Sequence, residues 1–301
     1  MTCASTQKIK GSLMNSFKRM VLCVLAVCLT QFHSLAASAQ QSKGKILIVL
    51  SSQQELPLKG DKSFTTGYYL NELVIPARKF ADAGYELVFA NPEGNTPAVD
   101  QTSLSADYFG GSQQALEEAE RYQGTLTGLA HPLKLSDVAR QDLSQYKAVF
   151  VPGGPAPMID LMADRDLGTI LRDFHRHKRT TVLLCHGPVA LLSTLHDAPA
   201  YQAALRSDNI AKAKRLASGW TYRGYQMTVF SNEEESIAAS NVFHADPLFT
   251  PEDGLTIAGG KMSSVSGWAP NVIQDRELIT GQNPASDAAL ADLTLRTLTA
   301  H

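Results

Sequence analysis

Apolar, β-rich runs alternate with amphipathic helical segments along this chain, and this alternation restricts the fold more than any other feature. Residues 44–52 (GKILIVLSS) are continuously apolar, as in strands buried on both faces of a parallel sheet. Residues 70–81 place apolar side chains at helical spacing, and Ala83-Gly84 ends that helix. Residues 85–90 (YELVFA) then form the next strand. The pattern predicts a βαβ unit with a right-handed crossover.

The alternation resumes in the second half of the chain, and no linker divides the part after the first forty residues. The final helix is expected to begin near Asn283-Pro284, with Asn283 as the cap and Pro284 at the first helical position. The other expected elements are strands at residues 146–154, 180–184, 225–231 and 277–281, a helix near residues 161–177, and a short connecting region around PEDGL. Together they predict one doubly wound α/β domain over residues 40–301, with a mostly parallel sheet and helices on both faces.

A polar segment of about residues 91–134 interrupts the alternation. It is long enough to be a disordered loop. Within it, residues 112–123 (SQQALEEAERYQ) have helical character. We therefore expect an inserted helical flap near the functional site.

The first 39 residues have the pattern of a cleaved secretory signal peptide. Lys18-Arg19 precede the apolar run of residues 20–29, and Ala37-Ser38-Ala39 fits the small-residue cleavage rule, with the cut after Ala39. A membrane anchor is the weaker alternative, because the run is shorter than the roughly 20 residues that span a bilayer. Lipid attachment at Cys28 is another alternative, for which the preceding Val27 fits poorly. We expect a protein exported to the periplasm or secreted.

Removal of this segment changes the charge and leaves a single cysteine. It takes away four of the 27 basic residues and none of the 29 acidic ones, which leaves a net charge of −6. No basic stripe indicates nucleic acid or an anionic membrane as a partner. Cys185 would be the only remaining cysteine, so no internal disulfide could form. A lone thiol in an oxidising compartment is a reason to suspect chemistry.

Cys185 follows the apolar run TTVLL and precedes Gly187-Pro188, which is typical of a helix start. The thiol is therefore expected on a strand-to-helix turn at the carboxyl edge of the sheet, where α/β folds place their ligands. Free amides at a helix N-terminus would lower the pKa of such a thiol, and a tight turn would push it out of the core. The alternative is a small buried hydrophobic residue, as most free cysteines are.

Four motifs in this order resemble the ThiJ/PfpI superfamily, which shares its fold with class I glutamine amidotransferases. They are TGYYLNELVIPARKFADAGYEL, VFVPGG, LLCHGPVALL and LITGQNPAS, and the similarity runs from about residue 45 to residue 293. The branch that is most similar contains glyoxalase III-like and heat-shock chaperone-type proteins. The resemblance implies a flavodoxin-like sandwich and favours a homodimer.

The resemblance also implies the residues of the site. Cys185 matches the nucleophile, His186 the adjacent histidine, and Glu72 the acid that hydrogen-bonds the cysteine. Without the resemblance, Glu72 would be a solvated glutamate of a first helical turn. Backbone amides of Gly153-Gly154 and His186 are expected to hold an oxyanion.

A third acid should orient the histidine, and the segment after residue 230 offers three consecutive glutamates. The family pattern makes Glu235 the match. Asn232 and Glu234 are the alternatives if the register differs, and Glu233 is the remaining glutamate. At least one of these acids must be solvated, because three like charges do not converge cheaply on one imidazole.

One departure from the family pattern affects the substrate. The family usually has Gly-Gly-His-Gly where this chain has Gly153-Gly154-Pro155-Ala156, and a proline has no amide to donate. The resemblance implies a cofactor-independent glyoxalase III-type lyase that converts methylglyoxal or a similar 2-oxoaldehyde to a 2-hydroxy acid such as lactate. We expect neither a cofactor nor a metal ion, and His175 and His177 are expected to be exposed.

Two other functions remain compatible with the sequence. A cysteine hydrolase, amidase or protein deglycase of the same superfamily would use the same nucleophile and would need an open groove. A holding chaperone would need an exposed apolar patch, and its activity would survive loss of the thiol.

Overall fold

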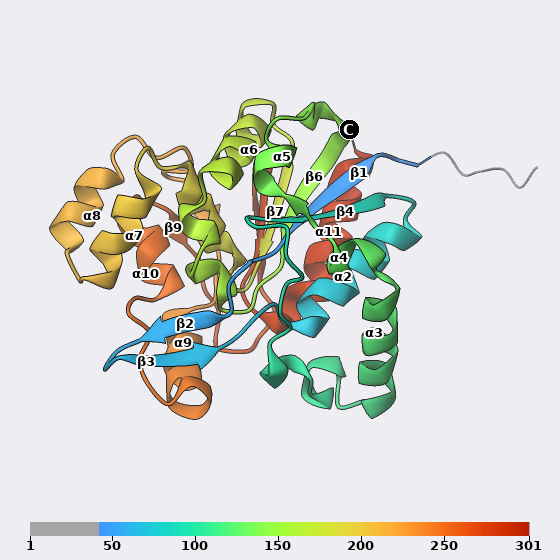
Figure 1. Ribbon diagram of the computed structural model, residues 1–301, viewed down its shortest axis with the longest axis horizontal. Helices are drawn as coiled ribbons and strands as arrows, with labels where there is room; N and C mark the ends of the chain where they lie inside the picture. Colours follow the sequence, from blue (N-terminus) through green and yellow to red (C-terminus); the bar gives the residue numbers. More distant parts are fainter. Residues whose placement is uncertain (1–41, 301) are drawn as a thin grey trace, which may run out of the picture. The chain divides into compact units, whose positions relative to one another are not determined.

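A seven-stranded sheet organises residues 42–300, which are the residues that the computed structural model describes (Figure 1). Six of the strands are parallel, and the edge strand β10 is antiparallel to β11. In spatial order they are β10 (Val272–Asp275), β11 (Leu278–Gly281), β7 (Thr180–Leu184), β6 (Tyr146–Val151), β1 (Lys45–Val49), β4 (Glu86–Asn91) and β5 (Leu133–Lys134). The signal peptide predicted at residues 1–39 lies outside the described residues.

Helices cover both faces of this sheet (Figure 1). Helix α2 (Leu70–Asp82) connects β1 to β4, and α6 (Arg165–Arg176) connects β6 to β7, in opposite directions along the sheet. Right-handed crossovers in opposite directions place their helices on opposite faces. Helix α11 (Asp287–Thr299) packs against α2 and shares its face. The prediction of a doubly wound α/β fold with a mostly parallel sheet is confirmed.

The sheet forms the core because its central strands are buried on both faces. Every residue of β7, and residues 46–49 of β1, are buried, as the continuous apolar runs predict. The strand order reverses between β1 and β6, and α/β folds place their ligands outside the carboxyl ends of the strands at such a point. Gly153 follows β6 and Cys185 follows β7 at this same edge.

The segment of about residues 91–134, which interrupts the alternation, is helical and packs against the helix α2 that covers the sheet. It contains η1 (Gln101–Ser103), η2 (Ala106–Phe109), α3 (Gln113–Thr125), and α4 (Thr127–Ala130). Ser112 caps α3 by accepting a hydrogen bond from the Ala115 amide. Leu116 and Ala119 of α3 are buried against α2. The expected helical flap is therefore present, and a disordered loop would have been the wrong interpretation.

The strand predicted at residues 225–231 is wrong in length and in partner. Only β8 (Gln226–Met227) is a strand, and it pairs with β9 (Lys261–Met262) outside the central sheet. Beyond it, the Thr228 amide donates to the Thr280 side chain, so the backbone continues no ladder. The connecting region around PEDGL forms helix α10 (Pro251–Ala258), which Thr250 caps.

Other elements escaped the sequence prediction or begin at different residues. The segment between β1 and α2 contains a hairpin, and the described chain between Cys185 and β8 also carries helices. These elements are β2 (Glu55–Leu58), β3 (Lys62–Thr65), α5 (Leu135–Val138), η3 (Leu143–Gln145), η4 (Ala156–Met158), η5 (Leu161–Ala163), η6 (Gly187–Thr194), α7 (Ala198–Arg206), α8 (Ile210–Leu216), α9 (Asn232–Ala238), the π-helical turn η7 (Ala239–Phe243) and η8 (Pro284–Ser286).

The final helical segment begins at Pro284, directly after Asn283, as predicted, but its first turn is a 3₁₀ helix. Residues 284–286 form η8, and α11 starts only at Asp287. The Asn283 side chain makes no cap, because its amide donates instead to Glu234 Oε1 and to the carbonyl of Ala269, both at 2.7 Å. Likewise Asp164 caps α6 by accepting from Leu167, which separates α6 from η5 in the predicted helix of residues 161–177.

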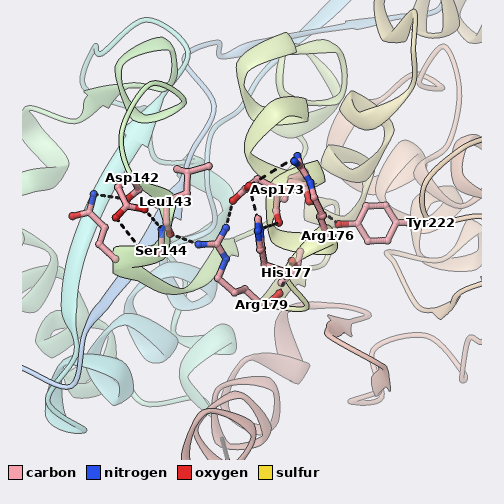
Figure 2. A network of polar contacts seen from close by, with 11 residues as sticks. Asp142, Leu143, Ser144, Asp173, Arg176, His177, Arg179 and Tyr222 are labelled. Atoms are coloured by element: carbon pink, nitrogen blue, oxygen red, sulfur yellow. Dashed lines mark hydrogen bonds and ion pairs between the residues drawn. The ribbon is translucent and has the colours of Figure 1, made fainter.

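A polar network holds the end of α6 against the start of β7 (Figure 2). Asp173 accepts from Arg179, which also donates to the carbonyl of Leu143, and Asp173 pairs with His177 at 3.2 Å. Arg179 directly precedes β7, so the network lies at the opposite end of that strand from Cys185. His177 is exposed as expected, whereas His175 is only half-exposed because it bonds Glu277 at 2.8 Å.

Candidate active site

Cys185 has a left-handed backbone, which is unusual for a residue with a side chain. Its φ of 58° lies in the region that costs an ordinary residue about 1–2 kcal/mol. Two backbone bonds hold it there: its amide donates to Gly281 at 2.9 Å and its carbonyl accepts from Phe230 at 2.9 Å. The turn leads into the 3₁₀ helix η6 and not into an α-helix. This is the geometry of a nucleophile elbow, in which a strained strand-to-helix turn carries the reactive side chain.

A glycine is required at position 153 because three groups lie too close to its backbone to leave room for a side chain. A Cβ at Gly153 would lie 2.4 Å from the Cys185 Cβ, 2.4 Å from Glu72 Oε2 and 2.7 Å from the Leu184 carbonyl. Gly154 has a φ of 87°, and a Cβ there would lie 2.1 Å from the carbonyl oxygen of Gly67. The two glycines therefore let α2 and the elbow meet at the end of β6.

The Cys185 thiol is buried, with only 2% of the residue exposed. Burial raises the pKa of this thiol well above its usual value, and the Glu72 carboxyl raises it further. A hydrogen bond from the Gly154 amide acts in the opposite direction. The expectation that the turn would expose the thiol and lower its pKa is therefore wrong for this conformation, because removal from water outweighs the amides around the sulfur.

Glu72 lies in the first turn of α2 and is completely buried. Its Oε2 accepts a hydrogen bond from the Gly153 amide at 2.9 Å. Burial raises the pKa of Glu72 to about 8, although hydrogen bonds with Cys185 and Gly153 partly offset the effect. The carboxyl is thus largely protonated at neutral pH and shares a hydrogen bond with the thiol. The alternative of a solvated helical glutamate is wrong.

His186 joins the thiol to an acid on the other side of its ring. Its Nδ1 lies 3.3 Å from Cys185 Sγ, and its Nε2 lies 2.9 Å from Glu235 Oε2. A carboxylate accepts only, so this arrangement places a hydrogen on Nε2 and leaves Nδ1 free to take the thiol proton. The Phe230 ring stacks on the imidazole, with 4.6 Å between ring centroids.

The three consecutive glutamates point to different partners because they lie in the first turn of α9. Glu234 forms a capping box with Ser231, and its carboxylate also accepts from Trp268, Gln282 and Asn283. Glu233 is exposed. Only Glu235, itself buried, reaches His186.

Asn232, the other alternative, faces away from the histidine. Its side-chain amide donates to Asp253 at 2.9 Å and its backbone amide donates to Glu252 at 2.6 Å. The structure therefore brings together Cys185, His186, Glu72 and Glu235, and it keeps the alternative acids apart from them.

Two backbone amides are placed to face an oxyanion beside the thiol. The Gly154 amide acts on the Cys185 sulfur so as to lower the pKa of the thiol. The His186 amide donates to no backbone carbonyl of residues 42–300. Pro155 is buried and begins η4, where its missing amide leaves no bond unmade. The proline therefore removes a donor from this edge without disturbing the turn.

Aromatic residues that the sequence analysis did not single out surround the thiol. The Tyr69 amide donates to the Gly153 carbonyl at 3.3 Å, and its ring packs edge-on against Tyr108 of η2, with 5.4 Å between centroids. On the other side, Trp268 packs edge-on against Phe230 at 5.8 Å. The aromatic residues of the inserted segment were the available signal, but their partner Tyr69, which directly precedes α2, becomes apparent only in the fold.

The described residues contain no group of three or more His, Cys, Asp or Glu side chains arranged to hold a metal ion. In the same part of the chain, no helix has the length and apolar character needed to cross a bilayer.

Comparisons with known proteins identify similar chains. The family model described as ThiJ/PfpI family-like matches residues 64–212. The protein/nucleic acid deglycase HchA of Pseudomonas aeruginosa is 27% identical over 259 residues, which cover 84% of this chain and 80% of the relative. The protein of the same name from Staphylococcus aureus is 25% identical, covering 85% of this chain and 80% of the relative.

Solved structures share the fold. Glyoxalase III from Candida albicans superposes with a TM-score of 0.61 at 22% identity, covering 84% of this chain and 97% of that one. The rapid encystment protein of Francisella tularensis gives a TM-score of 0.61 at 23% identity, covering 85% of this chain and 99% of that one.

Proposed function

Because this chain belongs to the ThiJ/PfpI superfamily, we propose that it is a cysteine-dependent enzyme acting on small carbonyl compounds, and specifically a glutathione-independent lyase of the glyoxalase III type. One observation carries the proposal: a strained elbow cysteine lies between a histidine–glutamate pair and a second, largely protonated carboxyl group. The resemblance of the fold to glyoxalase III supports it.

The reaction begins at the thiol. His186 Nδ1, 3.3 Å from the sulfur, takes its proton, and Glu235 stabilises the resulting imidazolium through Nε2. The thiolate attacks the aldehyde carbon of a 2-oxoaldehyde and forms a carbon–sulfur bond. The carbonyl oxygen becomes an oxyanion, which the amides of Gly154 and His186 stabilise. The raised pKa of the thiol makes this base necessary, because little thiolate exists beforehand.

Glu72 supplies the next protons. Its carboxyl group gives a proton to the oxyanion, and the resulting carboxylate removes the hydrogen from the former aldehyde carbon. The imidazolium of His186 protonates the neighbouring ketone oxygen, which gives an enediol. Glu72 then returns its proton to the second carbon while His186 takes the hydroxyl proton of the first. Oxidation of one carbon is thereby balanced by reduction of the other, and a 2-hydroxy thioester remains on Cys185.

Water then hydrolyses the thioester. The Glu72 carboxylate takes one proton of the water while the hydroxide adds to the thioester carbon, and the carbon–sulfur bond then breaks. The 2-hydroxy acid leaves, the sulfur recovers its proton from His186, and Glu72 is protonated again. With methylglyoxal as the substrate the product is lactate, and neither glutathione nor another cofactor takes part in the sequence.

Lactate formation from methylglyoxal in the absence of glutathione tests this proposal. The wild type is expected to form lactate, and Cys185→Ser is expected to lose activity about a thousandfold or more. Glu233→Gln, at an exposed residue of the same acidic run, should keep wild-type activity. A wild type that forms no lactate, or a serine variant that still forms it, would overturn the lyase proposal.

Deglycation is the second candidate, favoured by the similarity to the HchA relatives, which are protein/nucleic acid deglycases. The same thiol would attack the adduct between a carbonyl compound and an amine. Release of free amine from methylglyoxal-treated lysine, arginine or guanosine, lost in Cys185→Ser, would support it and would add proteins or nucleic acids as partners. Protection of a client protein from aggregation that is unchanged in Cys185→Ser would instead favour the holding chaperone.

We also propose that the protein is exported and acts in the periplasm or outside the cell. The signal-like pattern of residues 1–39 and the single cysteine of the remaining chain support this. A homodimer remains a prediction from the family resemblance.

A further inference from the structure

A large cavity lies beside the proposed active site. Its volume is about 1020 Å³. Its walls come from α2, from η2 and α3 of the inserted segment, and from the Pro284–Ser286 turn. None of the four proposed active-site side chains lines it. The cavity is therefore a space additional to the chemistry described above.

Three residues that line this cavity are also linked to residues of the proposed active site. Asn71 lines the cavity and directly precedes Glu72 on α2. Tyr108 lines it and packs against Tyr69, whose amide bonds Gly153. Trp268 lines it as well and packs against the Phe230 ring, which stacks on His186. These contacts place the cavity next to the residues that surround the reacting carbons, so a group attached to a carbon bound to the sulfur would extend toward it.

One of the elements that carry these three residues can open. Because Cys185 is 2% exposed, a substrate must displace something to reach it. The η2 turn that carries Tyr108 has no buried residue. It ends at Gly110 and Gly111, both left-handed, with no other group within 4 Å of where their Cβ atoms would be. Few packing contacts oppose a movement of this turn.

The size and the lining of the cavity indicate what it holds. Ligand sites commonly measure about 300–1,000 Å³, whereas methylglyoxal has only five non-hydrogen atoms. The apolar part of the lining is formed by Val74, Ile75, Tyr108, Phe109, Tyr122 and Trp268. The charged residues of the lining are one arginine and three acids, so they do not favour an anionic side group. Aromatic side chains arranged in this way suit an aromatic ring, packed edge-on or stacked.

We propose that this cavity holds the side group of the carbonyl substrate, and that the enzyme prefers 2-oxoaldehydes with an aryl group to methylglyoxal. The inference rests on the proposed function and assigns its substrate class. Tyr108 is then a specificity-determining residue, which lies between the reacting carbons and the aryl group.

Phenylglyoxal and methylglyoxal test the proposal because they share the reacting carbons and differ only in the side group. We expect an initial-rate kcat/KM at least about tenfold higher for phenylglyoxal. Ala285 lines the cavity and is exposed, so Ala285→Trp can fill the space without disturbing the core. This variant should lower the ratio of the two kcat/KM values about tenfold. Ala289→Trp, at an exposed alanine of α11 outside the cavity, should leave the ratio unchanged.

A second measurement separates the cavity from the catalytic proposal. Phenacyl bromide and bromoacetone alkylate thiols with the same reactive group and differ by phenyl against methyl. Their rates with Cys185, each divided by the rate with free cysteine, should favour phenacyl bromide in the wild type and lose that preference in Ala285→Trp.

Together the two measurements distinguish failure of the lyase proposal from failure of the aryl-site proposal. If neither oxoaldehyde is converted while the alkylation preference holds, the lyase proposal fails and the aryl site stands. A wild-type preference near one in both measurements, or equal effects of Ala285→Trp and Ala289→Trp, would overturn the aryl site.

Discussion

Cys185 and Glu72 both keep their protons at neutral pH because both are withdrawn from water. Burial raises the pKa of each group, and the Glu72 carboxyl raises the pKa of Cys185 further, whereas the interaction with Cys185 only partly lowers the pKa of Glu72. The pair therefore begins the reaction uncharged, and only the exchange with His186 creates a charge. A buried acid that stays protonated can serve first as a proton donor and then as a base within one turnover.

Substitution of Glu72 should change the pH dependence of stability. Its pKa is about 8 in the folded protein, against 4.5 for a glutamate in water, as in the unfolded chain. The folded state thus binds an extra proton between these pH values, and the free energy of unfolding falls as pH rises through this window, by up to about 1.4 kcal/mol per unit. Glu72→Gln should remove this contribution and become the more stable protein toward pH 8.

Urea unfolding of both proteins at several pH values between 4 and 9 measures the effect. Glu233→Gln is the matched control and should retain the wild-type slope, because its side chain is exposed. Parallel stability curves for wild type and Glu72→Gln across this range would contradict a buried, protonated Glu72.

At the scale of elements, helix α9 gives two neighbouring acids, Glu234 and Glu235, different structural roles. Glu234 closes the first turn of the helix and ties it to the chain around Trp268 and Asn283. Glu235, one residue further along, projects in another direction and meets His186. The orientation of the histidine therefore depends on a carboxylate that does not touch it.

Glu234→Gln should destabilise the protein and lower its activity together. An amide in place of the carboxylate would set its NH₂ group against the donors of Ser231, Gln282 or Asn283, at a cost of about 2 kcal/mol or more. Denaturant unfolding and lactate formation measure the two effects, with Glu233→Gln as the control at an exposed neighbour. If the two variants are equally stable, the Glu234 contacts contribute nothing to the position of α9.

The sequence predicted correctly those elements that form whichever neighbouring strand or helix they pack against. The run of residues 180–184 is apolar on both faces and so forms a central strand in any arrangement. The strand predicted at residues 225–231 failed because its pairing depends on β9, far along the chain. Ser231 and Glu234 form a capping-box motif, which could have predicted α9 from the sequence. The burial of Glu72 could not be predicted, because it depends on contact with Gly153.

At the scale of the whole molecule, the fold places the site where two halves of the sheet diverge. Glu72 arrives from the connection after β1, Gly153 from the end of β6 and Cys185 from the end of β7. Their convergence requires the parallel sheet, because only parallel neighbours bring these carboxyl ends to one edge. The family resemblance predicted these three residues, and the strand order accounts for their meeting.

Export of the whole chain can be tested through its cleavage site. Expressed in a Gram-negative host, the chain should be cut after Ala39, and mass spectrometry of the periplasmic protein should find Gln40 at its start. Ala39→Arg should block the cut. Ser38→Gln, at the unrestricted middle position of the Ala37-Ser38-Ala39 site, should not. An uncut chain in the cytosol would contradict the proposal.

Because Cys185 is buried, its reactivity with a thiol reagent can be used to count the molecules whose active site is intact. Cys185 is the only cysteine of residues 40–301. In the chain cut after Ala39, a thiol reagent consumed after denaturation therefore counts polypeptides, one equivalent each. Rapid consumption before denaturation counts the chains whose elbow has opened or unfolded, since an intact elbow leaves the sulfur almost no surface. The difference between the two readings is the concentration of closed sites, so a turnover number can be stated per competent molecule and not per chain.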